Sequence, residues 1–181
     1  TAVNTFDFQA SQYPDPPAMI ATAHAHGLRV ALWHTPYLET LAEPLRSEAV
    51  AAGYFPPATG LLLNRWSKPL DFTNPAAYDW WQGLIRRYTA DLGIEGFKLD
   101  YAEDVVPGLM GARNVWEFAD GSDERTMHQA YQHGYHEAYA SQLPKPTGLF
   151  AAQGGGWLLC RKSTWGDQTQ ASMIWPGDLC A

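Results

Sequence analysis

Hydrophobic and polar positions along the chain fall into blocks that predict helices and strands in alternation. Asp15 before Pro16 is a helix start, because a capping side chain followed by proline suits the first helical turn, and Gly27 should end that helix. The apolar run Leu28–Trp33 then predicts a strand. Such alternation is typical of a parallel α/β architecture, which is the fold class we expect.

The alternation continues through the rest of the chain. Asn74 and Pro75 begin a second helix, whose apolar residues recur at spacings of three and four until Gly93. A strand over Ile94–Tyr101 follows directly, then a helix over residues 123–142 and strands over Trp157–Lys162 and Ser172–Trp175. The expected buried faces are Tyr78, Trp81, Ile85, Tyr88 and Leu92 in the second helix, and Met127, Ala130, Tyr131, Gly134, Tyr135 and Ala138 in the third.

Residues 37–70, here called the excursion, interrupt this regular order between a strand and a helix. Their periodicity is weak and several prolines divide them, although one helix is expected near residues 43–52. A connection of this length in a compact domain is usually functional. We expect residues 1–181 to form one domain that includes the excursion.

Composition and charge narrow the classes of function. The net charge of −7, with no basic tract, argues against a nucleic-acid partner, because phosphate binding needs clustered Lys and Arg. No apolar run approaches 18 residues, so no membrane span is expected. Aromatic residues make up 13% of the chain, and aromatic rings stack well on the apolar faces of sugars. This excess suits a carbohydrate site, although most single aromatics should belong to the core.

The ends of the chain and its cysteines give little information on its compartment. No signal or transit segment is visible, and Thr1 opens the sequence abruptly, so a processed or truncated N-terminus is expected. Cys160 and Cys180 match neither a zinc site nor a disulfide framework. Cys160 lies in an apolar run and should be a buried thiol.

The segment at residues 96–104, GFKLDYAED, is the most informative for chemistry. Side chains alternate faces along a strand, so Phe97, Leu99 and Tyr101 should pack on helices while Lys98 and Asp100 share the other face. The Lys would offset the cost of burying the carboxylate and favour its ionised form. An ionised Asp at the carboxyl end of a strand suits nucleophilic glycoside chemistry. A structural ion pair at the rim of a barrel fits this segment equally well.

Two later segments carry polar groups at strand ends. Arg161 follows the apolar residues 157–160, which places it at a rim where a ligand would lie. The tetrapeptide Trp175–Asp178 ends a strand in a tight turn and sets an acid beside an indole. Burial against Trp175 would raise the pKa of Asp178, as a general acid requires. An ordinary Pro-Gly turn with an exposed Asp178 is the alternative.

The order of these motifs resembles glycoside hydrolase family 31, the α-glucosidase and α-xylosidase family. The resemblance runs from about residue 5 to the end of the chain. Its motifs are YPDP at 13–16, LWHTP at 32–36, DFTNP at 71–75 with Trp80 and Trp81, GFKLDYAE at 96–103, His128 with Tyr131, RKSTWGDQ at 161–168, and WPGD at 175–178.

The resemblance implies a (β/α)8 TIM barrel, of which this chain supplies strands 3–6 with their helices. It implies a retaining α-glycosidase that hydrolyses terminal α-linked sugars by double displacement, without metal or cofactor. Asp100 would be the nucleophile and Asp178 the acid/base. Substrate-binding residues would be Arg161, Trp33, Lys98 and Trp175. His128 and Tyr131 would hold their helix in place, and Glu103 or Asp104 would hydrogen-bond and orient Asp100.

The sequence also departs from the family. A complete barrel needs about 250 residues, and the acidic residues of an earlier strand and a late histidine are missing. A partial barrel exposes sheet edges and apolar surface. We therefore expect a fragment of a longer enzyme or one module of a split barrel. Besides an oligosaccharide or glycoside substrate, its expected partner is the remainder of the barrel or another copy of itself.

Three other functions compete with this one. A barrel glycosidase of the α-galactosidase type also places a Lys shortly before its nucleophilic Asp. A catalytically incomplete sugar-binding or scaffold module would bind sugars without hydrolysis. A metal-dependent barrel enzyme of the enolase kind would need three carboxylates on successive strand ends, whereas only Asp100 and Asp178 are so placed.

Overall fold

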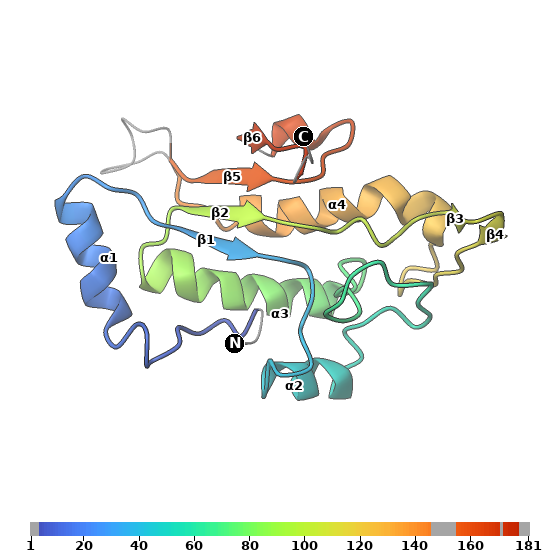
Figure 1. Cartoon of the computed structure of the whole chain (residues 1–181), viewed down its shortest axis with the longest axis horizontal. Coiled ribbons are helices and arrows are strands. Elements are labelled where there is room, and N and C mark those ends of the chain that lie inside the picture. The colour runs from blue at the N-terminus through green and yellow to red at the C-terminus, as the bar shows by residue number, and fades with distance from the viewer. Residues whose placement is uncertain (1–3, 146–154, 171, 178–181) are drawn as a thin grey trace.

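The computed structural model describes residues 4–145, 155–170 and 172–177. A four-stranded sheet with flanking helices organises the chain (Figure 1). In chain order the elements are α1 (Pro16–Ala25), β1 (Ala31–His34), α2 (Leu45–Ala51), α3 (Pro75–Arg86), the π-helical turn η1 (Arg87–Asp91), β2 (Gly96–Leu99), β3 (Gly108–Leu109), β4 (Ala112–Arg113), α4 (Glu124–Ala140), β5 (Trp157–Cys160), the 3-10 turn η3 (Asp167–Thr169) and β6 (Met173–Ile174).

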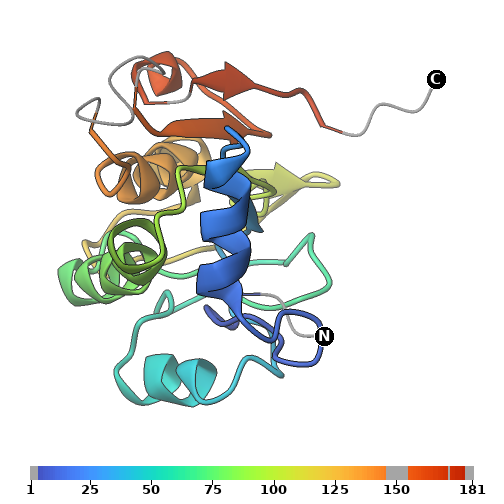
Figure 2. The ribbon, with the colours of Figure 1, turned by 90° about the vertical axis from the view of Figure 1, so that its left-hand side faces the viewer.

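The sheet is parallel throughout, in the order β1-β2-β5-β6. Its last matched row joins His34, Leu99, Cys160 and Ile174, so all four strands end at one level. Helices α3 and α4 lie side by side on one face of the sheet, as the end-on view shows (Figure 2). This sequential parallel arrangement confirms the expected α/β class and corresponds to part of an α/β barrel.

Capping side chains begin the helices where the sequence predicts. The Asp15 carboxylate accepts a hydrogen bond from the backbone N–H of Ala18, and Asn74 caps Ala76 and Ala77 in the same way. Each of these two helices has proline in its first turn. In α4 the predicted buried face holds at Met127, Tyr131, Tyr135 and Ala138, whereas Gly134 is half-buried and Ala130 is exposed. The predicted short helix in the excursion is α2.

The first two strands are shorter than predicted. β1 begins at Ala31 because the N–H of Val30 donates to the side chain of Glu95. β2 ends at Leu99 because Tyr101 and Ala102 have φ angles of 65° and 84°, which turn the chain out of the strand. The predicted packing of Tyr101 on the helices is therefore wrong, and its ring lies on the opposite side, under Arg161.

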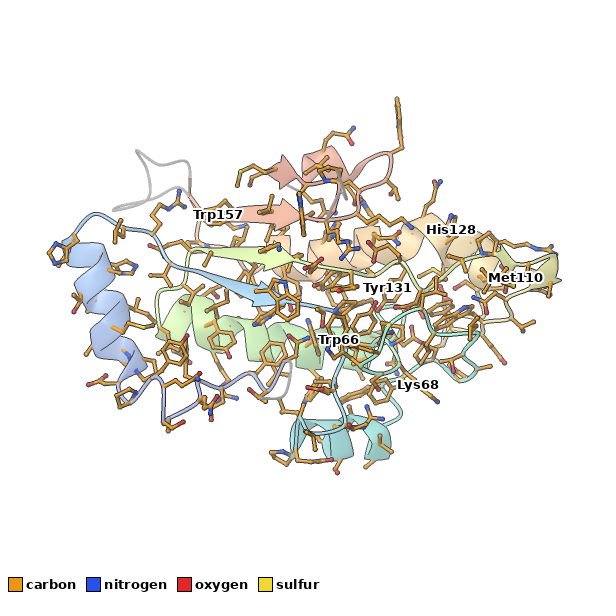
Figure 3. The ribbon with its side chains drawn as sticks, in the orientation of Figure 1. Trp66, Lys68, Met110, His128, Tyr131 and Trp157 are labelled. Atoms are coloured by element: carbon orange, nitrogen blue, oxygen red, sulfur yellow. The ribbon has the colours of Figure 1, made fainter. Side chains whose placement is uncertain are left out.

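A hairpin between β2 and α4 was not predicted. Its turn is Met110-Gly111, with φ angles of 49° and 81°, as the tight turn of a two-residue hairpin requires. Arg113 on β4 then pairs with Asp123 and Glu124 at the start of α4, which fixes the hairpin to that helix. Met110 lies at the tip, far from the sheet, and is almost fully exposed (Figure 3).

The core between the sheet and α3 and α4 is rich in aromatic rings. Phe97 and Tyr139 pack with centroids 5.0 Å apart, and Phe6 packs on Trp81 at 4.7 Å. The thiol of Cys160 is buried there, as predicted, and burial raises its pKa to about 12. No helix in the described ranges is both long and apolar enough to cross a membrane.

His34 is the one histidine of β1, and it faces this core. Its Nδ1 lies 2.8 Å from the hydroxyl of Tyr139, and rings of Phe6, Phe97 and Tyr88 surround it. Burial lowers the pKa of His34 to about 3, because an imidazolium would lose its hydration there. The folded protein thus holds His34 neutral, whereas the unfolded chain takes up a proton near pH 6.5.

This difference predicts a pH-dependent stability. Between pH 6.5 and 3 the unfolded state binds more protons at His34 than the folded state, so stability falls as the pH falls. Relative to His34→Asn, the wild type should lose up to about 1.4 kcal/mol of unfolding free energy per pH unit below 6.5. Urea denaturation from pH 7 to pH 4 measures this. The exposed His26→Asn is the control, and a constant difference between wild type and His34→Asn would contradict the assignment.

The sheet is open at both sides, because β1 and β6 each have one neighbour among the described strands. A groove of about 1000 Å³ runs along the free side of β1, and apolar residues such as Phe8, Leu32 and Tyr88 line it. Of the predicted site residues, Trp33 alone among those described borders this groove. The groove is thus a feature of the open edge and reaches the charged cluster at the strand ends through Trp33.

Candidate active site

Asp100 directly follows β2 and is only 5% exposed. Its backbone N–H donates to the carbonyl of His34 at 2.9 Å, which continues the sheet by one residue. Both carboxylate oxygens have partners. Trp33 Nε1 donates to Oδ2 at 2.8 Å, and Oδ1 accepts from Arg161 Nη1 at 3.2 Å and from the backbone of Tyr101 at 3.0 Å. Asp100 is therefore fixed in both position and orientation.

Two cations stabilise negative charge at this carboxylate. Lys98 Nζ lies 3.6 Å from Asp100 Oδ2, which confirms the predicted pairing on one face of β2. Arg161 approaches from the neighbouring β5. Trp175, which follows β6, covers the pair: its ring centroid lies 3.8 Å from Lys98 Nζ and 5.9 Å from the Arg161 guanidinium carbon. Five of the six predicted site residues are thus brought together.

Glu103 forms the second partner of Arg161. Arg161 Nε lies 3.1 Å from Glu103 Oε1, so one planar guanidinium bridges Glu103 and Asp100. Burial raises the pKa of Glu103, and the Arg161 charge opposes that rise. Burial acts to lower the pKa of Arg161, but the two carboxylates raise it. The guanidinium also stacks on the Tyr101 ring, with 4.5 Å to the centroid.

The prediction that Glu103 or Asp104 orients Asp100 directly is wrong. Two carboxylates offer only acceptors to each other, and Glu103 acts through Arg161 instead. Asp104 turns away to the excursion and accepts the backbone N–H of Leu63 at 2.6 Å. The predicted structural role of His128 and Tyr131 is confirmed: they bond to the carbonyls of Val105 and Leu70, at 2.7 and 2.8 Å.

Trp66 is a site residue that sequence reasoning missed. It lies on the excursion, beyond the tip of β1 (Figure 3). Its ring centroid is 6.1 Å from that of Trp33 and 4.4 Å from that of Tyr101, which it meets edge to face. Trp33, Trp66 and Tyr101 thus form an aromatic wall beside Asp100. The length of the excursion indicated function, but nothing in its weak periodicity identified Trp66.

The loop that follows Arg161 is held to α4 by a buried acid. Asp167 accepts from His133 Nδ1 at 2.9 Å and from the backbone N–H of Thr164 at 2.7 Å, and His136 Nδ1 lies 3.5 Å away. Burial acts to raise the pKa of Asp167, but the proximity of His136 and the hydrogen bonds from Thr164 and His133 hold that pKa at about 2. Both histidines therefore pack the loop that follows Arg161 against α4.

Asp178, the predicted acid/base, lies outside the described residues, as does Cys180. Within the residues described, no group of three or more His, Cys, Asp or Glu side chains is placed to hold a metal ion. The described cluster can position a carboxylate, stabilise its charge and offer aromatic faces to a ligand. Aromatic faces beside a few fixed polar groups are the elements of a site for a small organic ligand.

Comparisons with known proteins agree with this chemistry. The model of the glycosyl hydrolases family 31 TIM-barrel domain matches residues 1–181. An α-xylosidase of Emericella nidulans is 30% identical over 96% of this chain and 21% of its own length. A sulfoquinovosidase of Agrobacterium fabrum is 28% identical over 96% of this chain and 26% of its own length.

A solved structure shares the fold. The family 31 sulfoquinovosidase from E. rectale, in complex with the aza-sugar inhibitor IFGSQ, superimposes with a TM-score of 0.76 at 22% identity. It covers 96% of this chain, which matches 25% of that chain. The present chain thus spans about a quarter or less of the length of these relatives. Because the family model matches its whole length, the chain belongs to glycoside hydrolase family 31.

Proposed function

We propose that this chain carries the catalytic face of a retaining α-glycosidase that cleaves terminal α-linked sugars, with Asp100 as the nucleophile. The observation that carries the proposal is the environment of the Asp100 carboxylate. It is buried, held by Trp33 and Arg161, and faced by the Lys98 ammonium. A fixed anion at the carboxyl end of a barrel strand is what attack on an anomeric carbon needs.

The reaction would proceed in two displacements. In the first, Asp100 bonds to the anomeric carbon while the bond to the leaving-group oxygen breaks, and Asp178 gives that oxygen a proton. In the second, Asp178 removes a proton from water, whose oxygen bonds to the anomeric carbon and releases Asp100. Configuration is inverted twice and so retained. Arg161 and Lys98 would stabilise the negative charge of the Asp100 carboxylate before attack and after release.

The aromatic wall gives the sugar a place to bind. Trp33 is 39% exposed although its indole N–H is bonded to Asp100, so its ring can contact a ligand that also meets the carboxylate. We infer that Trp33 and Trp66 of the wall, together with Trp175, contact the sugar ring, while Arg161 and Lys98 bind its hydroxyls. A sugar, with apolar ring faces and many hydroxyl groups, would satisfy both kinds of neighbour.

A panel of nitrophenyl glycosides tests this function. Nitrophenyl α-xyloside, α-glucoside, α-galactoside and α-sulfoquinovoside are each incubated with the active protein, meaning this chain or a longer polypeptide that contains it. Release of nitrophenol, with a first-formed sugar of α configuration by NMR, is the expected result. We place the α-xyloside first because the α-xylosidase of Emericella nidulans matches nearly the whole chain. A β-configured first product would overturn the retaining mechanism.

A second candidate is a catalytically incomplete sugar-binding module. The open edges of β1 and β6, and the match to about a quarter or less of the relatives' lengths, favour it for the isolated chain. In that case the chain would bind a sugar column without hydrolysing any member of the panel. If a longer polypeptide that contains this chain hydrolyses a member of the panel, the chain is assigned to a glycosidase and not to a binding module.

Arg161→Lys should separate binding geometry from charge. Lysine keeps the positive charge but cannot bridge Asp100 and Glu103 with one planar group. Loss of a charge-assisted hydrogen bond costs about 1.5–3 kcal/mol, so kcat/KM should fall roughly 10- to 100-fold. Steady-state kinetics measures this, with circular dichroism to confirm the fold. Arg86→Lys, on the exposed side of α3, is the control, and an unchanged kcat/KM for Arg161→Lys would make the bridge purely structural.

A further inference from the structure

Asp104 is a buried carboxylate whose bonding partners all come from the excursion. It is 2% exposed and lies four residues after Asp100. Its Oδ2 accepts from the Tyr37 hydroxyl and from Asn64 Nδ2, the latter at 3.1 Å, while Oδ1 accepts the backbone N–H of Leu63 at 2.6 Å. These donors lie near the two ends of the excursion, so one carboxylate joins both ends to the segment that follows the β2 strand.

Asn64 extends this connection to Trp66. While its Nδ2 donates to Asp104, its Oδ1 accepts the backbone N–H groups of Trp66 and Ser67, at 2.7 and 2.9 Å. The same Nδ2 also bonds to the carbonyl of Ser67 at 2.9 Å. The turn that presents the Trp66 ring is therefore built around the side chain that Asp104 holds.

Tyr37 extends the connection in the other direction. Its hydroxyl donates to Asp104 and accepts the backbone N–H of Ala102 at 3.2 Å. Ala102 and Tyr101 both have left-handed φ angles, a conformation that costs non-glycine residues energy and persists only where neighbours hold it. Gln132 completes the support by donating to the Ala102 carbonyl at 2.6 Å. The turn directly after Asp100 thus depends on the same carboxylate.

We propose that Asp104 is a positioning residue that sets Trp66 and the Tyr101–Ala102 turn relative to Asp100, and so fixes the aromatic wall that receives the sugar. Its effect on catalysis rests on the proposed function, whereas its hold on the excursion does not. A carboxylate suits this role because three donors converge on it and both oxygens must accept. An amide of the same shape has one acceptor oxygen and would set its NH2 group against at least one donor.

Asp104→Asn tests the hold on the excursion in this chain without any substrate. We expect hydrogen exchange at the backbone N–H of Leu63 and Trp66 to become at least about 10-fold faster, while the strand amide of Phe97 is unchanged. Asp79→Asn, an exposed acid on α3, is the matched control and should alter none of these rates. Unchanged exchange at Leu63 and Trp66 in Asp104→Asn would overturn the proposal, whatever the activity.

The consequence for catalysis has a separate readout in the active protein. A displaced wall weakens substrate and transition state alike, so KM should rise roughly 10-fold while kcat stays within about threefold. Simple loss of folded enzyme would instead lower kcat at constant KM. In a Trp66→Ala background, Asp104→Asn should raise KM little further, because both changes disrupt the same aromatic wall. Additive effects on KM would overturn the positioning role.

Tyr37→Phe provides a second variant should Asp104→Asn fold poorly. It keeps the ring that stacks 5.7 Å from Trp66 and removes only the hydroxyl between Asp104 and Ala102. Exchange at Leu63 and Trp66 should change in the same direction by a smaller factor. If exchange rises as expected and the wild type hydrolyses no sugar, the proposed function fails while the role of Asp104 in the fold stands.

Discussion

Asp100→Ala should abolish the covalent glycosyl-enzyme with every substrate. No other described carboxylate meets Trp33, Lys98 and Arg161 as Asp100 does, so none can take its place at the anomeric carbon. Removal of one member of a catalytic unit typically lowers kcat by about 10⁴- to 10⁶-fold. Intact-protein mass spectrometry after incubation with an activated 2-fluoro glycosyl fluoride measures the adduct, which should appear only in proteins that keep Asp100.

Asp100→Asn is the companion variant. It keeps the volume of the side chain and can still accept from Trp33, so its fold should be close to that of the wild type. We expect it to form no adduct either, because an amide oxygen is a poor nucleophile. Unfolding curves of both variants show whether a missing adduct is instead due to loss of the folded structure. A covalent adduct in either variant, mapped by peptide digestion to another residue, would remove Asp100 from the role of nucleophile.

Asp178→Ala should behave differently, although both carboxylates belong to one reaction. Loss of a general acid costs on the order of 10²–10⁴ in rate, and the cost falls mainly on substrates with poor leaving groups. Fluoride departs without a proton, so formation of the glycosyl-enzyme from a glycosyl fluoride should largely survive. Hydrolysis of that intermediate should slow, because no base then activates water.

Azide gives this prediction a chemical signature. It needs no general base, so it should restore turnover of the Asp178 variant and yield a glycosyl azide of retained configuration. A retaining pair of carboxyl groups should lie about 5–5.5 Å apart, against about 6.5–9.5 Å for an inverting pair. An inverted azide product, or equal loss of fluoride substrates in the Asp100 and Asp178 variants, would show that the two roles are assigned wrongly.

The parts of the site that lie on strands could be predicted from the sequence. Lys98 and Asp100 are two residues apart, and side-chain alternation alone puts them on one face. Arg161 follows an apolar strand that pairs with β2, so its position at the same level follows from the parallel order. Local pattern is sufficient here because the sheet repeats the same geometry at each strand.

The irregular parts could not be predicted, for two physical reasons. Tyr101 takes a left-handed conformation that its residue type does not favour, and the distant side chains of Tyr37 and Gln132 hold this turn through bonds to Ala102. Trp66 is placed by Asn64 and Asp104, whose contact spans 40 positions in the sequence. Neither feature has a local signature.

The hairpin at Met110-Gly111 has a local signature, because a glycine turn between short apolar runs favours a tight hairpin.

The alignment of the strand ends has a consequence for how such an enzyme can diversify. The residues after the last matched row, among them Asp100, Arg161 and Trp175, are each bonded by their backbone N–H to the preceding strand. The backbone positions of Asp100 and Arg161 are therefore set by the sheet, while loop residues such as Glu103 and Tyr101 also contact the Arg161 side chain. Loop positions that bond neither these side chains nor Asp104 can therefore vary in sequence without moving the backbone at the strand ends. An engineer who wishes to alter specificity should change the excursion between Tyr37 and Leu63, keep the groups that bond Asp104, and leave the strand ends untouched.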